Sequence, residues 1–272
     1  MRKVETVANY FILMLFSVFA LFPLLWMLTT ALKPVGQTFH YPPQWLPKPV
    51  TLENFIRVFS QLPFFNYALN TIYVTLLVLI GQLVFCTGSA YAFARLRFPA
   101  RDLIFTILLG SLMIPEIVTM IPNYIIMKTL GWLDSFKAVI LPQFFGSAFG
   151  VFLMRQFFIT IPKELEDAAK IDGAGVLRTL WLIIVPMSKP ALGTLAVLTF
   201  LKAWNNFLWP LIVINSEQKY LLSVALSNLQ GQYYSDWSGI MAIAFLALLP
   251  MLLIFAFTQR YFIRSIQMSG IK

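Results

Sequence analysis

Long apolar segments constrain this chain more than any other feature of its sequence. Six of them reach the roughly 20 residues that an α-helix needs to cross a bilayer. They lie at residues 9–31, 66–94, 102–127, 138–157, 188–214 and 238–262. Only 11% of the residues are charged, whereas about a quarter are charged in soluble globular domains. The sequence therefore predicts an all-α membrane protein with six transmembrane helices.

The first apolar segment lies where a secretory signal peptide would lie. It is longer than the hydrophobic region of a signal peptide, and no convincing small-x-small cleavage site closes it. We therefore expect residues 9–31 to be a retained first span.

Lysine and arginine are unequally distributed between the two sides that six spans define. Thirteen share a side with both chain ends: Arg2, Lys3, Arg95, Arg97, Arg101, Arg155, Lys163, Lys170, Arg178, Lys189, Arg260, Arg264 and Lys272. Six lie on the other side: Lys33, Lys48, Arg57, Lys128, Lys137 and Lys219. The positive-inside rule then predicts cytoplasmic termini. Because the basic residues are spread over several cytoplasmic segments, we expect no nucleic-acid partner despite the net charge of +9.

Side chains that catalyse reactions or bind metals are scarce. His40 lies in a Pro-rich loop, where a surface side chain is the expected role, and Cys86 lies in an apolar segment and has no disulfide partner. We expect no catalytic residue, metal or cofactor. A membrane enzyme would need clustered His, Asp or Cys residues. A secondary transporter, the main alternative, would need inverted repeats and several intramembrane carboxylates, whereas the sequence has one such carboxylate and no repeat.

Two loops are expected outside the membrane. In the loop at residues 33–65, the first part, 33–50, contains five prolines and is followed by a short amphipathic helix at TLENFIRVF with Thr51 as its N-cap. Residues 215–237 are rich in Gln, Asn, Ser and Tyr. A polar contact surface and a simple connection are equally compatible with that second loop.

Residues 162–190 concentrate charge between two apolar segments. Pro162 suits the first turn of a helix, and the acidic residues that follow it favour the positive end of the helix dipole. Gly173 is expected to end this helix in the left-handed conformation, and a second helical run, 174–184, leads to Pro186 and Pro190. The first helix has a low, apolar face formed by Leu165, Ala168, Ala169 and Asp172. By pattern alone, an ordinary amphipathic connecting helix is a better interpretation than a docking element.

The same segment resembles the EAA loop of ABC-transporter permease subunits, in which E-A-A is followed after three residues by Gly and after nine more by Ile-x-Leu-Pro. Here the motif reads Asp167-Ala168-Ala169, then Gly173, then Ile183-Ile184-Val185-Pro186. Asp replaces Glu and Val replaces Leu. The resemblance implies that the loop is a coupling helix that docks on an ATPase. The coupling residues would be Glu164, Glu166, Asp167, Ala168, Ala169, Asp172, Gly173 and Pro186.

The resemblance covers nearly the whole chain. FPLLWMLTTALKP (22–34), KAWNNFLWPLIV (202–213) and QRYFIRSIQMSGIK (259–272) resemble the second permease subunit of carbohydrate importers of the maltose type, although Ser265 stands where Gly is usual. The resemblance implies a type-1 ABC importer permease fold. Its parts would be a first span with an external loop (1–65), a five-helix core (66–262) with the coupling loop at 158–187, and a cytoplasmic tail (263–272).

The resemblance also implies partners and a location. These are a second permease, two cytoplasmic ATP-binding subunits, an external solute-binding protein and the lipid of a bacterial or archaeal cytoplasmic membrane. The substrate would be a sugar, an oligosaccharide or a polyol phosphate. Consistent with a separate ATPase, the chain contains no G-x-x-x-x-G-K-[ST] phosphate loop.

Four polar residues stand out inside predicted spans, where ionisable groups are costly and are candidates for function. Glu116 and Lys202 are expected at similar depth, where they could pair, line the translocation path or reach an interface instead. Asn205 and Asn206, beside Trp204, could line the path for a sugar or join helices by hydrogen bonds. We expect Pro115, Pro122 and Pro210 to kink their helices, and Gly146 and Gly150 to permit close helix packing.

Overall fold

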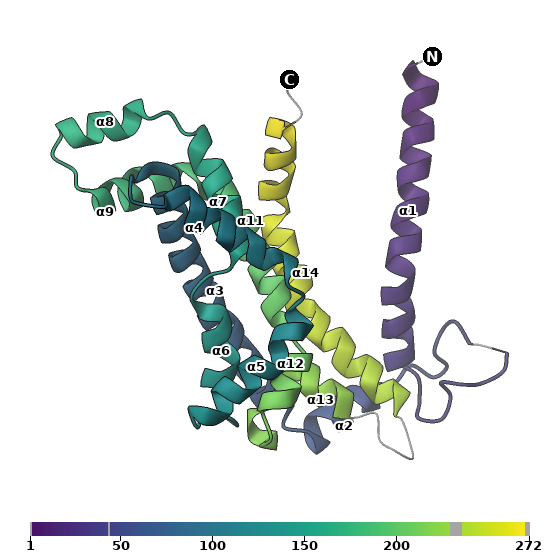
Figure 1. Cartoon of the computed structure of the whole chain (residues 1–272). Helices are drawn as coiled ribbons and strands as arrows, with labels where there is room; N and C mark the ends of the chain where they lie inside the picture. Colours follow the sequence, from purple (N-terminus) through teal and green to yellow (C-terminus); the bar gives the residue numbers. More distant parts are fainter. Residues whose placement is uncertain (1, 43, 229–235, 270–272) are drawn as a thin grey trace. The chain divides into compact units, whose positions relative to one another are not determined.

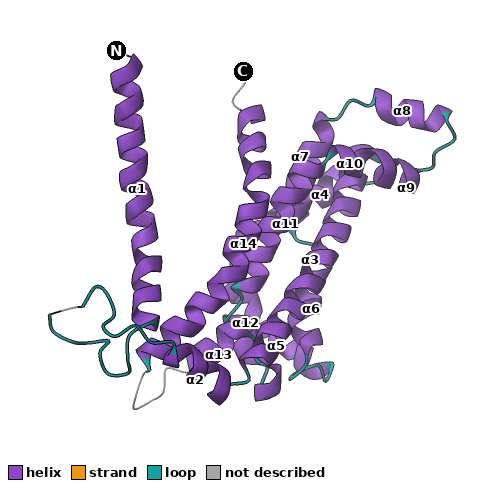
Figure 2. Ribbon diagram, turned by 180° about the vertical axis from the view of Figure 1, so that it is seen from behind, coloured by secondary structure: helices purple, strands orange, loops and turns teal. Residues whose placement is uncertain are grey.

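The computed structural model describes residues 2–42, 44–228 and 236–269, without the side chains of residues 2–5, 8, 61 and 258–269. Every regular element in the described part is helical, as Figure 2 shows, which confirms the predicted all-α fold. The α-helices are α1 (Arg2–Ala31), α2 (Glu53–Gln61), α3 (Phe64–Arg95), α4 (Arg101–Gly110), α5 (Glu116–Thr129), α6 (Phe136–Phe144), α7 (Ala148–Thr160), α8 (Glu164–Ile171), α9 (Val176–Thr179), α10 (Val185–Met187), α11 (Lys189–Trp204), α12 (Leu208–Val213), α13 (Leu222–Asn228) and α14 (Trp237–Ser269). Short 3₁₀ or π turns lie at Ser111–Met113 (η1), Leu180–Ile184 (η2) and Glu217–Lys219 (η3).

By length and composition, four helical segments are able to cross a membrane. They are Asn9–Ala31, Phe64–Arg95, Phe136–Thr160 and Trp237–Phe257. Two bent helix pairs raise the number to six if each pair is one span: Arg101–Met113 with Glu116–Thr129, and Val176–Met187 with Lys189–Trp204. These segments overlap the six apolar segments of the sequence, but the last pair covers 176–204, whereas the predicted fifth span is 188–214. The predicted third, fourth and fifth helices are interrupted, the fourth at residues 145–147 between α6 and α7.

The third predicted span, 102–127, is not one kinked helix. Its two halves meet at 102°, because Ile114 and Pro115 are both extended, with ψ of 116° and 134°. A proline disfavours the helical conformation of the residue before it, which accounts for the break at Ile114. Pro122 lies inside α5. The expected kink is therefore a full interruption at Pro115.

The fifth predicted span, 188–214, is also interrupted, but at a different place from the one expected. Helix α11 ends at Trp204 and α12 begins at Leu208, whereas Pro210 lies inside α12. Pro210 was expected to kink this span, but the interruption lies at residues 205–207, before α12 begins. A second bend, of 83°, separates α10 from α11 at Ser188.

The chain divides into two compact units, of which unit 2 comprises residues 69–223 and 253–272. Helices α8 and α9 lie at one end of unit 2, and α5, α6 and α12 lie toward the opposite end (Figure 1). One apolar core joins α3, α7 and α11 through Cys86, Met154, Phe158 and Leu195. A second core joins α3 to α5, α6 and α12. Helix α3 therefore connects the two ends of the unit.

Glycines allow the close packing of unit 2. A Cβ atom on Gly150 would lie 2.6 Å from Cys86 Sγ, and one on Gly81 would lie 2.4 Å from the carbonyl oxygen of Phe144. Ser147 caps α7 by accepting a hydrogen bond from the Gly150 N–H at 3.1 Å. The Gly146–Gly150 pattern therefore serves packing within this chain, as the sequence suggested.

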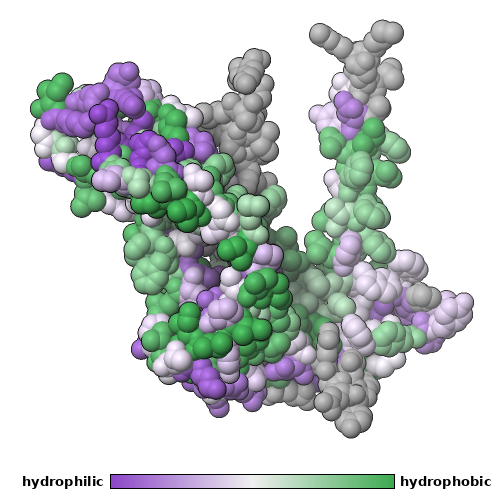
Figure 3. Space-filling view, in the orientation of Figure 1, coloured by the Kyte–Doolittle hydropathy of each residue, from purple (hydrophilic) through white to green (hydrophobic). Residues whose placement is uncertain are grey.

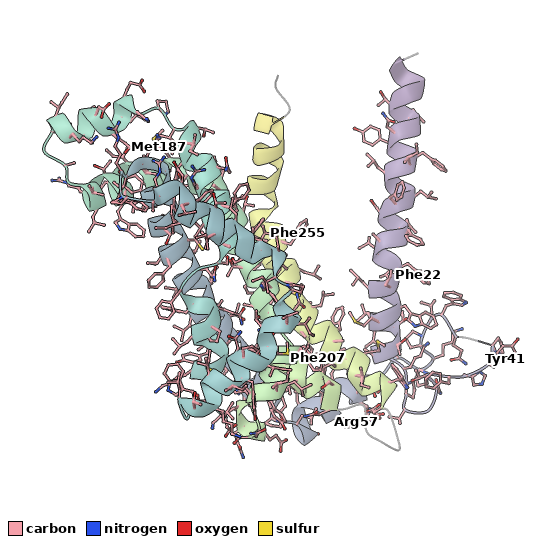
Figure 4. All side chains as sticks on the ribbon, viewed as in Figure 1. Phe22, Tyr41, Arg57, Met187, Phe207 and Phe255 are labelled. Carbon is pink, nitrogen blue, oxygen red and sulfur yellow. The ribbon has the colours of Figure 1, made fainter. Side chains whose placement is uncertain are left out.

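Unit 1 comprises residues 1–68 and 224–252. Asn54 of α2 is fully buried and donates hydrogen bonds to the carbonyls of Ala31 and Lys33, both at 2.7 Å, which ties α2 to the end of α1. The residue immediately before α2 is Leu52, but the Thr51 hydroxyl accepts the Glu53 N–H at 3.1 Å, so Thr51 still performs the expected capping contact. Within the loop that follows α1, Tyr41 is widely exposed (Figure 4).

Candidate functional site

The segment singled out in the sequence forms a short helix that is separated from its neighbours by loops. Helix α8 begins at Glu164, two residues after Pro162, so Pro162 precedes the first turn rather than lying in it. Gly173 follows the helix with φ of +77°, as predicted. The Ala174 N–H closes the end of the helix by donating to the Ala169 carbonyl at 2.8 Å. The second helical run begins at Val176, later than predicted, and includes a π turn at 180–184.

Helix α8 has two different faces. Glu166 and Ala169 are its buried residues. The other predicted coupling residues are exposed: Glu164, Asp167, Ala168, Asp172, Gly173 and, in α10, Pro186. Apolar Ile171 is exposed as well, at 87%. Hydrophilic residues gather over this end of unit 2 (Figure 3), near which Met187 lies (Figure 4). The structure thus divides the predicted set into an outward face and an inward face that contacts its own chain.

The inward face carries a buried ion pair that the sequence did not reveal. Glu166 Oε1 lies 2.6 Å from Arg95 Nε, and the two side chains are only 8% and 5% exposed. The Tyr91 hydroxyl donates to Glu166 Oε2 at 3.0 Å. Arg95 also donates to the carbonyls of Phe158 at 2.8 Å and Ile161 at 2.5 Å. One guanidinium therefore joins the ends of α3 and α7 to α8.

From the sequence, Arg95 is predicted only to contribute to the positive charge that sets the membrane topology. A usable signal was present, because Tyr91 and Arg95 are four residues apart and so share one face at the end of an apolar helix. What the sequence lacked was the partner, because Glu166 is 71 positions away and stands among several other acidic residues.

The second predicted site lies where two spans are interrupted. Glu116 is the first residue of α5, and Lys202 lies in the last turn of α11. The structure brings these two side chains together as an ion pair. Both are well exposed in the chain by itself, Lys202 at 59% and Glu116 at 79%. This ion pair therefore lies on the surface of unit 2, not in its interior.

The two asparagines lie in the second interruption. Exposed Asn205 donates its side-chain amide to the Leu201 carbonyl at 2.9 Å. The Asn206 carbonyl accepts the Ser223 hydroxyl at 2.8 Å. Trp204 is buried and stacks on Phe200 with ring centroids 5.3 Å apart. Phe207, also part of the interruption, is partly exposed and lies toward the end opposite α8 (Figure 4). Asn205 is therefore exposed beside the ion pair, whereas Trp204 serves the core and offers no platform for a sugar.

A polar cluster around Asp134, away from α8, was not predicted. Asp134 has φ of +55° and accepts hydrogen bonds from the N–H groups of Asn215 at 3.0 Å and Ser216 at 2.8 Å. Lys219 Nζ lies 2.8 Å from Asp134 Oδ2. The hydrogen bonds from Lys219 and Ser216 lower the pKa of Asp134 well below its usual value. Asp134 therefore fixes the first part of the polar 215–237 segment, of which residues 229–235 lie outside the described residues.

Within the described part of the chain, no three His, Cys, Asp or Glu side chains gather in a way that could hold a metal ion. Cys86 is buried among α3 and α7 residues and accepts the Ser147 N–H at 3.4 Å.

Comparison with known proteins shows similar chains among transport-system permeases. The arabinooligosaccharides transport system permease protein AraQ of Halalkalibacterium halodurans is 33% identical over 93% of this chain and 91% of its own length. The sn-glycerol-3-phosphate transport system permease protein UgpE of Yersinia pestis is 32% identical over 90% of both chains. A chain of the crystal structure of a bacterial ABC transporter involved in the import of the acidic polysaccharide alginate superimposes with a TM-score of 0.83 at 27% identity, covering 96% of this chain and 97% of that one.

The family comparison covers most of the sequence. Residues 50–268 match the family described as the binding-protein-dependent transport system inner membrane component. The matched region includes the interrupted spans, α8 and the Glu116–Lys202 pair. The chain belongs to this family of membrane-spanning permease subunits of ABC importers.

Proposed function

We propose that this chain couples ATP hydrolysis on partner subunits to the passage of a sugar, an oligosaccharide or a polyol phosphate across the cytoplasmic membrane. The observation that carries the proposal is the outward face of α8. It presents Asp167 and Ala168 of the E-A-A-like motif on a helix that ends sharply at Gly173. A small side chain such as Ala168 lets a partner approach closely, and Ile171 adds exposed apolar surface.

The energy for transport would come from two ATPase subunits. The chain has no phosphate-binding loop of the G-x-x-x-x-G-K-[ST] type. ATP binding would close the ATPases, α8 would move with them, and rigid-body motion of the spans would change which side of the membrane has access. A second permease and an external solute-binding protein would complete the importer.

The orientation follows from the distribution of basic residues. The α8 end and both termini would face the cytoplasm, because that side carries thirteen of the 20 lysines and arginines. The Asp134 cluster would then lie outside, where the binding protein arrives. The segment from Asn215 to Lys219 that Asp134 fixes is suited to such a contact.

The Glu116–Lys202 pair would line the translocation path. Charged groups are costly against lipid, and irregular backbone within a membrane is tolerated where it is buried in protein or lines a water-filled cavity. Two helix interruptions, a charged pair and the exposed amide of Asn205 occur together here. A water-filled path beside them would accommodate both the charges and the irregular backbone. The surface that carries them would face the second permease across the path. Asn206, through its carbonyl contact with Ser223, would support this arrangement from within the chain.

The relatives support the proposed class of substrate. Their names refer to arabinooligosaccharides and sn-glycerol-3-phosphate, and both are polyhydroxylated. A transporter driven by an ion gradient, the alternative raised by the sequence, receives no support from these relatives.

Co-purification in mild detergent tests the proposal. We expect an ATPase and a second permease to accompany the wild-type chain. Ala168→Trp and Gly173→Pro should release the ATPase, the first by blocking close approach and the second because proline cannot adopt φ of +77°. Leu103→Trp, at an exposed position of α4, is the matched control and should retain it. Retention of the ATPase by both α8 variants would contradict the proposal.

A further inference from the structure

Helix α8 is attached to unit 2 through few side chains. Of its eight residues, Glu166 and Ala169 are buried, and short non-helical segments connect it to α7 and α9. Alanine offers little more than a contact surface. Among the described side chains, the carboxylate of Glu166 is therefore the polar group that attaches α8 to the rest of unit 2.

That carboxylate uses both of its oxygens. Oε1 contacts Arg95 at 2.6 Å, and Oε2 accepts from Tyr91 at 3.0 Å. Tyr91 and Arg95 lie one turn apart in the last part of α3, so both partners belong to one rigid element. The Tyr91 ring also contacts Phe158 of α7 edge-on, with centroids 6.4 Å apart. A displacement of Glu166 therefore pulls on α3 and α7 together.

Burial distinguishes this contact from an ordinary surface ion pair. Solvent and salt weaken an exposed pair, and its long side chains move freely. The Glu166–Arg95 contact is shielded from both, and Arg95 is held further by two carbonyls of the α7 end. Such a contact is stiff, whereas the loops on either side of α8 lack the hydrogen-bond ladder of a helix.

We propose that Tyr91, Arg95 and Glu166 form a joint that transmits the movement of α8 to helix α3. This inference rests on the proposed coupling function and assigns its internal part: the outward face of α8 receives the movement, and the inward face passes it on. Because α3 belongs to both apolar cores of unit 2, movement at its α8 end reaches the end that holds α5, α6 and α12. Without the joint, the connecting loops would absorb the displacement.

The test separates ATPase docking from transmission in the complete transporter, purified with its partner subunits in lipid nanodiscs. Cys86→Ala removes the chain's one cysteine, and Phe207→Cys, in the interruption between α11 and α12, serves as reporter. A membrane-impermeant maleimide measures its accessibility without nucleotide and with ATP plus vanadate. We expect the modification rate to change at least about fivefold between these states in the reference protein, as for a nearly complete shift between two conformations.

The decisive variant replaces both charges, Arg95→Met with Glu166→Leu, which leaves no lone charge buried. It should keep the ATPase bound, with a hydrolysis rate within about twofold of the reference. The nucleotide-dependent change in the modification rate should fall below about twofold, because nucleotide no longer biases the conformational equilibrium. If the accessibility of Phe207→Cys still changes fully with nucleotide in this variant, the proposal that these residues form a joint is overturned.

Tyr91→Phe removes one hydrogen bond while retaining the ring, and it keeps the test valid if the double variant does not assemble. It should reduce the accessibility change while leaving ATPase binding intact, and an unchanged response would overturn the proposal. The α8 variants that block docking, such as Ala168→Trp, should instead lose the ATPase itself. Absence of an ATPase from the reference complex would refute the coupling function, and the joint with it.

Discussion

Two carboxylate–cation pairs in unit 2 have similar chemistry and opposite surroundings. Glu166 and Arg95 are buried by their own chain, and every oxygen of the carboxylate has a partner. Glu116 and Lys202 are paired but exposed, on a surface that the chain by itself leaves open. The first pair is complete within one subunit. The second lies in a membrane protein where lipid is a poor environment for charge, and we propose that other parts of the importer supply its surroundings.

The comparison shows how burial sets the role of an ion pair. Removing one partner of a buried pair leaves the other charge buried without a partner, which is strongly destabilising. An exposed pair contributes little to the free energy of folding. We therefore expect mutations of the Glu166–Arg95 pair to affect stability and coupling together. Mutations of the Glu116–Lys202 pair should affect transport with little effect on stability.

The largest effect on stability is expected for Arg95→Ala. It leaves the Glu166 carboxylate without its ion-pair partner and removes the hydrogen bonds from Arg95 to the carbonyls of Phe158 and Ile161, and breaking a buried pair costs about 3–5 kcal/mol. Hydrogen exchange should show loss of protection at the end of α7 and in α8. Arg97→Ala, two residues along at an exposed position, is the matched control and should change stability by less than about 0.5 kcal/mol. Equal losses of stability in Arg95→Ala and Arg97→Ala would show that the buried position of Arg95 has no special effect on stability.

An intermediate effect is expected for the Asp134–Lys219 pair, whose side chains are partly exposed. The folded pKa of Asp134 is depressed, so its contribution is present above the unfolded pKa of about 4 and is lost as the pH falls through the folded pKa. After allowance for solvent screening, we expect about 0.5–1 kcal/mol. Thermal unfolding between pH 6 and pH 3 should show the beginning of this loss, and Asp134→Asn should reduce the pH dependence. A variant with the wild-type pH profile would contradict this role for Asp134.

The smallest effect on stability is expected for Glu116→Gln and Lys202→Met, below about 1 kcal/mol each. Transport should nevertheless fall strongly in both, if the pair lines the path. Uptake of arabino-oligosaccharide or glycerol phosphate by vesicles, compared with the melting temperature, separates the two quantities. Normal uptake by both variants would show that the pair is incidental to transport.

Local features of the structure follow well from the sequence. The apolar segments predicted the helical spans, and Gly173 predicted the left-handed end of α8. The interruptions were predicted less well. Proline at 115 forces the break at Ile114 more completely than a kink, whereas the break at 205–207 occurs without proline. At that second break, the carbonyl of Asn206 accepts a hydrogen bond from Ser223. This contact cannot be predicted from the spacing of residue types along the chain.

The candidate sites show the same limit. The residues of α8 were singled out by the resemblance to the EAA loop, whereas the pairing of Glu116 with Lys202 was one of the outcomes expected from their residue types and depths. The inward orientation of Glu166 was not found, because several acidic residues of α8 are equivalent by composition. Which one faces inward is decided by the positions of Tyr91 and Arg95 at the end of α3. Sequence identified the segment, and packing assigned the face.

Cysteine cross-linking of α8 tests the central claim most directly. In a Cys86→Ala background, Ala168→Cys places a thiol on the outward face and Ala169→Cys places one on the buried face. A bifunctional reagent of short span should join position 168, but not position 169, to the ATPase in the intact complex. Cross-linking from position 169 alone, or from neither position while the ATPase remains bound, would contradict a helix whose outer face docks and whose inner face holds its own chain.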